Sequence, residues 1–165
     1  MRRIIVICLA VALAWCAGCS SGVDRKKFEG PRKAAQAVMA SIDSLDDYEK
    51  FSRVFDAFAN EVLMLRDKVS SAREKELLQN YTDLLVTYQD GLQLWEYKVE
   101  STRYSWIPEG VIYLEPKIKA LALKYQLPVQ SHLVELTRHE WKSVPADSLK
   151  VIWDRAKTQM KSLGP

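Results

Sequence analysis

The two histidines of the chain are the residues whose type most directly suggests chemistry. His132 and His139 are seven positions apart with Glu135 between them, and on a helix all three would share one face. Imidazole and carboxylate groups are zinc ligands. Seven residues span about 10 Å along a helix, however, whereas helical zinc motifs place their ligands closer together. The spacing therefore favours two surface histidines, with no metal and no cofactor.

Recognisable catalytic motifs are absent from the sequence. No Gly-x-Ser-x-Gly segment seats a serine nucleophile, and neither a glycine-rich phosphate loop nor His-Glu-x-x-His occurs. The paired carboxylates are expected at helix caps or on solvated faces, where catalytic pKa values are not favoured; they are Asp46 with Asp47, Glu74 with Glu76, and Glu96 with Glu100. The sequence predicts no catalytic residue, so an enzyme ranks third among the candidate functions.

Aromatic side chains are the surplus of this sequence. Trp95, Trp153 and Tyr125 fall on faces that are predicted to point inward, so core packing is the favoured explanation for most of the rings. Aromatic rings with a polar end also anchor protein interfaces. The functional alternative is a partner surface made of Tyr97, Tyr104, Trp106 and Trp141.

Two heptad series supply the elements that would position these side chains. Apolar residues recur at alternating spacings of three and four, which is typical of packed helices. The series are Tyr48, Phe51, Phe55, Phe58, Val62, Leu65 and Val69, then Leu78, Tyr81, Leu85, Tyr88, Leu92, Trp95, Val99 and Thr102. With Ser44 as an N-cap and a break at Ser70-Ser71, the pattern predicts an antiparallel hairpin of helices about 36 Å and 40 to 45 Å long.

Shorter segments complete an all-α prediction, a small helical bundle built on that long antiparallel hairpin. Helices are expected over 31–42, 116–125 and 146–162, because proline and glycine residues mark their ends. Residues 129–141 are expected to form a helix rather than an irregular strap. Gly91 either admits a neighbouring chain closely or is a tolerated surface glycine.

The amino terminus has the order of a secretion signal. Arg2 and Arg3 precede an uncharged apolar run, Ile4 to Trp15, and polar residues follow it. The run is too short to span a bilayer, which needs about 20 apolar residues. The chain is therefore expected to be exported.

Cys16-Ala17-Gly18-Cys19 closes this signal and resembles the lipobox of bacterial lipoproteins, although that family usually has leucine where Cys16 stands. The resemblance implies cleavage before Cys19, diacylglycerol on its sulfur and an acyl group on the new amino terminus. Nearby alanines leave an ordinary signal peptidase as the alternative. Ser20 after the cysteine resembles lipoproteins sent to the outer membrane, facing the periplasm; the alternative is the periplasmic face of the inner membrane.

The expected organisation is a signal peptide at 1–18, a lipidated tether at 19–30 and a helical domain at 31–165. Cys8 and Cys16 would leave with the signal and Cys19 would be blocked, so the mature protein would have no free thiol and no intramolecular disulfide. Its 22 basic and 21 acidic side chains exclude a basic nucleic-acid-binding domain. Residues 43–115 carry a formal charge of −7 and residues 116–165 carry +5, so the two parts are expected to attract each other or to face different partners.

These observations predict a lipid-anchored cell-envelope protein that acts as a non-catalytic interaction or structural module, with the membrane and an envelope protein as partners. The alternative is a periplasmic binding module for an apolar or aromatic ligand held between the hairpin and the C-terminal helices. A continuous concave pocket would favour that alternative.

Overall fold

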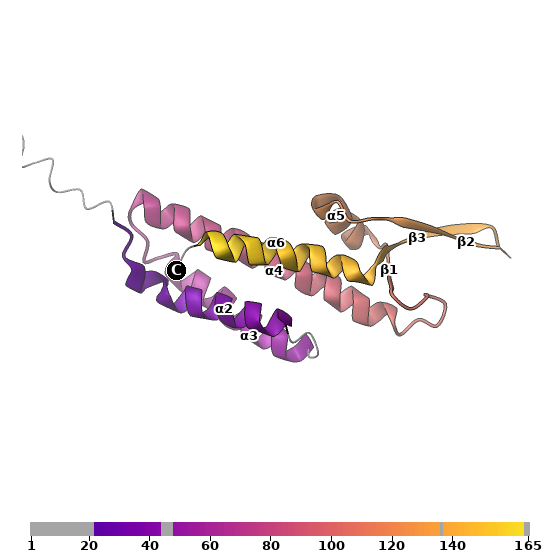
Figure 1. Cartoon of the computed structure of the whole chain (residues 1–165), viewed down its shortest axis with the longest axis horizontal. Helices are drawn as coiled ribbons and strands as arrows, with labels where there is room; N and C mark the ends of the chain where they lie inside the picture. The colour runs from indigo at the N-terminus through magenta and orange to yellow at the C-terminus, as the bar shows by residue number, and fades with distance from the viewer. Residues whose placement is uncertain (1–21, 44–47, 136, 164–165) are drawn as a thin grey trace, which may run out of the picture.

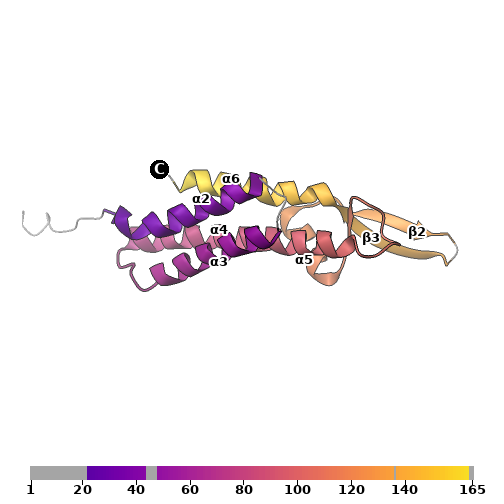
Figure 2. The same ribbon diagram turned by 90° about the horizontal axis from the view of Figure 1, so that it is seen from below.

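The long helix α4 (Ala72–Ser101) is the axis around which the other elements are arranged (Figure 1). The computed structural model describes residues 22–43, 48–135 and 137–163. Helices α3 (Tyr48–Leu65) and α6 (Leu149–Ser162) pack on α4, and α2 (Glu29–Asp43) packs on α3 and contacts α6 (Figure 2). We refer to these four helices as the helical body. Within the described residues, no helix is long and apolar enough to cross a membrane.

The two heptad series form α3 and α4, but α3 ends at Leu65, so the last member of the first series, Val69, lies in the loop and the helix is shorter than the predicted length of about 36 Å. Rings meet in reverse order along the two helices, with Phe51 against Trp95 at 5.5 Å and Phe58 against Tyr81 at 6.4 Å between centroids, so the helices run antiparallel. The wholly buried or nearly buried members of the first series are Phe51, Phe58, Val62 and Leu65. The predicted N-cap Ser44 and the pair Asp46 and Asp47 lie outside the described residues.

Helix α6 approaches α4 at Gly91. The indole of Trp153 occupies the space that a side chain at position 91 would need, because a β-carbon there would overlap its six-membered ring. Trp153 also packs against Phe51 and Tyr88, with centroid distances of 5.2 and 6.4 Å. Of the two explanations for Gly91, the structure supports the close approach of a neighbouring chain.

The all-α prediction is wrong in the segment that follows α4. The strands β1 (Val111–Tyr113), β2 (Gln130–Val134) and β3 (His139–Pro145) form an antiparallel sheet in the order β1-β3-β2. The protein is therefore α+β, mostly helical with a small sheet. The β2–β3 hairpin projects beyond the end of the helical body, away from the end where α2 begins (Figure 1).

The helix expected over 129–141 is wrong because this segment is held as strands by a third strand, β1, that lies outside it in the sequence. Val129, Leu133 and Leu136 have helical spacing, yet β3 pairs with β2 and also with β1, placing Ile112 opposite Val144. Both of these side chains are fully buried. Their burial fixes the register, and a pattern confined to residues 129–141 does not contain it.

The short helix between β1 and β2 is confirmed as α5 (Pro116–Tyr125). Pro116 occupies its first turn, and Gln126 ends it in the left-handed conformation, with a φ of 52°. The Tyr125 hydroxyl donates to the Asp90 carboxylate at 2.6 Å, and Lys124 forms an ion pair with the same group. These contacts attach α5 to the middle of α4.

The chain is already folded on α4 within the segment expected to be a tether. The 3-10 helix η2 (Arg25–Phe28) buries Phe28, whose ring stacks on Tyr81 at 6.0 Å. The Glu74 carboxylate accepts hydrogen bonds from the Asp24 N–H at 3.3 Å and from Lys27 Nζ at 2.9 Å. Residues from Val23 onward therefore belong to the packed part of the molecule.

Glu74 also ends the loop between α3 and α4. It is the third residue of a capping box with Ser71, as its position near a helix start suggests, but it is 2% exposed and not on a solvated face. Its carboxylate accepts from the Ser70 N–H at 2.9 Å and the Ser71 N–H at 3.3 Å. These bonds lower the pKa of Glu74 to about 2; the largest effect comes from the hydrogen bond of the Ser70 N–H, and the next from the hydrogen bond of Lys27.

We expect Gly91→Ala to destabilise the protein, although alanine favours helices over glycine by about 1 kcal/mol. The new methyl group overlaps the ring of Trp153, and overpacking of this kind costs about 1 to 3 kcal/mol. Gly30→Ala is the control, because its β-carbon meets only the flexible end of Glu61. Chemical denaturation measures both variants. Equal or greater stability of Gly91→Ala would contradict the close packing of α6 on α4.

Glu74 predicts a specific loss of stability in acid. Its pKa is lower in the folded state than the ordinary value of 4.5, so its contribution is complete above that value and is lost as the pH falls towards 2. Glu74→Gln should be less stable than the wild type at pH 7, and the difference should shrink to near zero at pH 2. Denaturation curves of both proteins across this range measure the difference. The exposed Glu76→Gln should follow the wild type throughout.

Candidate functional site: an aromatic cluster on the sheet

One face of the sheet brings together side chains from all three strands. In the antiparallel register Tyr113 lies opposite Ser143, and His132 lies opposite Trp141. Opposed residues, and residues two apart on one strand, share a face. Tyr113, His132, Trp141 and Ser143 therefore project from the same side of the sheet.

Trp106 lies over this face from the segment between α4 and β1. Its ring meets Tyr113 at 5.4 Å and Trp141 at 5.6 Å in edge-to-face arrangements, with interplanar angles of 78° and 81°. Tyr104 is 6.3 Å from Trp106. Such geometries are favoured by the ring quadrupole. We define the aromatic cluster as Tyr104, Trp106, Tyr113, His132 and Trp141.

The cluster has a buried base and an exposed surface. Trp141 is 8% exposed, whereas Trp106 and Tyr104 are 56% and 47% exposed. Ile107, the residue after Trp106, is buried, and its N–H donates to the Tyr104 carbonyl oxygen at 3.0 Å. This turn holds the two exposed rings outward while their neighbours support them from below. The arrangement presents apolar area in a fixed orientation, at little further cost in side-chain entropy on binding.

His132 is fixed within the cluster. Its ring stacks on Trp141 with a centroid distance of 4.0 Å and an interplanar angle of 16°, and its Nε2 is 2.8 Å from the Ser143 Oγ. A serine and histidine at this distance could resemble a nucleophile and base. Ser143 is fully buried, however, so a substrate carbonyl has no access to its hydroxyl. The pair positions the imidazole ring against Trp141.

The second histidine is not part of the cluster. His139 begins β3 opposite Val134 and is exposed, as is Glu135 at the tip of the hairpin. Because His132 and His139 lie on two strands, they do not share the helical face with Glu135 that the predicted helix would have given them. Among the described residues, no group of three potential ligands is placed to hold a metal ion.

Three of the four residues predicted as a partner surface come together, namely Tyr104, Trp106 and Trp141. Tyr97 does not join them. It is half-buried on α4 and packs against the core. The pKa of its hydroxyl is raised, mainly by partial burial and to a smaller extent by the nearby Glu115 carboxylate. Sequence reasoning missed Tyr113 and His132. The alternation of charged Glu140 and Lys142 with uncharged Trp141 and Ser143 is the sequence signal for a strand, and the structure buries the uncharged pair.

No family model, curated protein or solved structure matches this chain. The evidence for a site is therefore the geometry of the cluster itself.

Truncating the two tryptophans should lower stability by very different amounts. Trp141→Ala removes a nearly buried ring and should cost about 3 kcal/mol or more. Trp106→Ala removes a ring that is more than half exposed and should cost about 1 kcal/mol or less, which lowers the melting temperature by a few degrees. Thermal melts followed by circular dichroism compare the two. A large loss for Trp106→Ala would place that ring among the structural residues and remove it from the candidate surface.

Proposed function

We propose that this chain is a lipid-anchored protein of the bacterial cell envelope that acts as a non-catalytic interaction module. Its partner is an envelope protein that receives the exposed rings of Trp106 and Tyr104. The observation that carries this proposal is that both rings are about half exposed while they rest on a fixed base of Tyr113, His132 and Trp141.

The location rests on the amino-terminal segment. The signal and the lipobox-like Cys16-Ala17-Gly18-Cys19 support cleavage before Cys19 and lipid attachment to its sulfur. Two or more acyl chains hold a protein firmly, since each buried CH₂ contributes about 0.8 kcal/mol. Cys19 itself lies outside the described residues. Outer-membrane sorting, facing the periplasm, is part of the proposal and follows from Ser20.

The arrangement of the two ends supports a role in reaching a partner at a distance from the membrane. The described chain begins beside η2, at the start of α4, and the strands β2 and β3 lie at the other end of that helix (Figure 2). The aromatic cluster is built on those strands, on β1 and on the segment after α4. Thirty residues of α helix span about 45 Å. A protein anchored at Cys19 would thus carry the cluster well away from the bilayer surface.

Cluster chemistry also favours binding over catalysis. Exposed tryptophan and tyrosine rings are common binding hot spots. The one Ser–His pair of the cluster has its hydroxyl fully buried. The alternative, a binding module for an apolar or aromatic ligand held between the hairpin and the C-terminal helices, stays a hypothesis; a cavity at the opposite end of α4, with a basic rim, is considered below.

Crosslinking at the exposed rings tests the proposal in cells. A photoreactive phenylalanine analogue at position 104 should crosslink the lipidated protein to one discrete envelope partner, because Tyr104 lies at the edge of the cluster. Trp106→Ala in the same chain should weaken the crosslink about thirtyfold, the effect of losing roughly 2 kcal/mol at a hot spot. The same analogue at Leu123, which is exposed on α5, should give no such product.

Metabolic labelling tests the anchor independently. Cys19→Ser removes the sulfur that the thioether requires, so a fatty-acid label should be lost. Label retained on the serine variant would contradict the anchor. An equal crosslink from positions 104 and 123, or one that Trp106→Ala leaves unchanged, would contradict the partner surface.

A further inference from the structure

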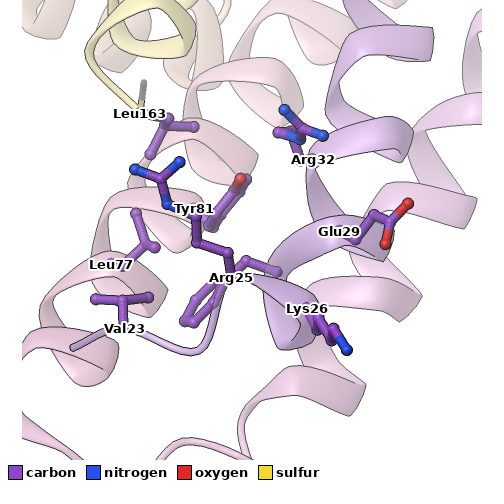
Figure 3. Close-up of a pocket in the computed structure, with 9 residues that line it drawn as sticks. Val23, Arg25, Lys26, Glu29, Arg32, Leu77, Tyr81 and Leu163 are labelled. Atoms are coloured by element: carbon purple, nitrogen blue, oxygen red, sulfur yellow. The ribbon is translucent and has the colours of Figure 1, made fainter. Parts of the chain in front are cut away.

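A cavity of about 480 Å³ opens at the end of the helical body where the chain enters. Its floor is apolar, with Phe28 and Tyr81 only 4% and 2% exposed. Leu77 of α4 and Leu163, which follows α6, extend this surface (Figure 3). The cavity is therefore lined by residues near both ends of the described chain, together with residues of α4.

The rim of the cavity is basic. Arg25, Lys26 and Arg32 line it together with one carboxylate, Glu29. Glu29 forms an ion pair with Lys33 at 2.6 Å, whereas neither Arg25 nor Arg32 forms one with any carboxylate in the part of the chain that the structure describes. In Figure 3 the Arg25 side chain extends towards Tyr81 and Leu163, and Glu29 points away from them. Two guanidinium groups thus remain available for an anion.

The cavity lies close to the proposed lipid anchor. Only Ser20, Ser21 and Gly22 separate Cys19 from Val23, which lines the cavity. Four residue steps span about 14 Å at most. The headgroup layer on each side of a bilayer is roughly 6 Å thick. An anchored chain therefore keeps this end of the molecule within reach of the headgroups.

We propose that the cavity binds the headgroup of an anionic membrane phospholipid. Arg25 and Arg32 pair with the phosphate, and the first carbons of the acyl chains lie along Leu77 and Leu163, which are half-buried and line the cavity above Phe28 and Tyr81. The inference rests on the proposed lipid anchor, since that anchor brings the cavity to the membrane. Guanidinium groups suit phosphate because their planar donors bind it in pairs.

The apolar floor favours a lipid over a free anion. Inorganic phosphate would use the guanidinium groups and leave the half-buried apolar side chains of the lining, Val23, Leu77 and Leu163, in contact with water. An amphiphile with an anionic head satisfies both parts of the cavity. Binding would also orient the protein, because the aromatic cluster at the far end of α4 would then face away from the bilayer.

Amide hydrogen exchange on the full lipidated chain in nanodiscs tests the inference. Discs of phosphatidylcholine are compared with discs of an equimolar mixture of phosphatidylcholine and phosphatidylglycerol. In the mixed discs, exchange over Arg25–Arg32 should slow about tenfold, the factor expected when a ligand is present at ten times its Kd. Arg25→Gln combined with Arg32→Gln should return exchange to the phosphatidylcholine rate.

Lys117→Gln with Lys119→Gln is the matched control, because both residues are exposed on α5 and the change of charge is the same. This variant should keep the full slowing. Equal exchange of the wild type in the two kinds of disc would overturn the inference, as would equal loss of slowing in the control variant. Similar slowing by inorganic phosphate in phosphatidylcholine discs would assign the cavity to free anions and exclude the lipid.

The anchor is measured separately. A chain without lipid does not stay in phosphatidylcholine discs. If the protein produced from the full sequence failed to incorporate into these discs, the proposed anchor would be contradicted. The cavity would then be tested by the same exchange measurement with vesicles of the equimolar mixture. Slowing there would support the lipid site alone, and its absence would overturn it.

Discussion

The contact between Trp153 and Gly91 is the constraint on which the rest of the structure depends. Burial of an indole removes about 150 to 250 Å² from water, which stabilises the fold by roughly 4 to 6 kcal/mol. The Trp153 Nε1 is buried without a hydrogen-bond partner in the described residues, at a cost of about 1 to 3 kcal/mol. Packing therefore prevails, and it holds α6 along the face of α4.

The position of α6 in turn determines where the sheet forms. β3 leads through the 3-10 helix η3 (Ala146–Ser148) directly into α6, and β1 follows the turns that end α4. Both strands must therefore meet at the same end of the helical body. Their pairing buries Ile112 and Val144 on one side of the sheet and leaves the other side to the aromatic rings. The cluster therefore depends on the packing of α6 against α4, which brings β1 and β3 together.

Polar interactions position individual segments in this arrangement, whereas apolar packing supplies most of its stability. The uneven charge of the two halves of the chain yields the ion pair of Lys124 with Asp90, with Lys124 nearly half exposed. Exposed pairs contribute about 1 kcal/mol or less. Glu74 is different, because its buried carboxylate joins the N-terminal segment to the start of α4. Through that carboxylate, the cavity-forming segment is part of the folded unit that also carries the aromatic cluster.

The sequence by itself determined the helices whose signals are local. The heptad spacings located α3 and α4, and the prolines around 116 and 128 bounded α5. Gly91 was recognisable as a special position, but only the fold showed that Trp153, 62 positions later, fills the space. β1 and β3 are also far apart in the chain, so no local pattern indicates that they pair. The exposure of Trp106, the burial of Glu74 and the joining of Arg25 with Leu163 in one cavity were likewise decided by tertiary structure, because each depends on a neighbour that no local pattern identifies.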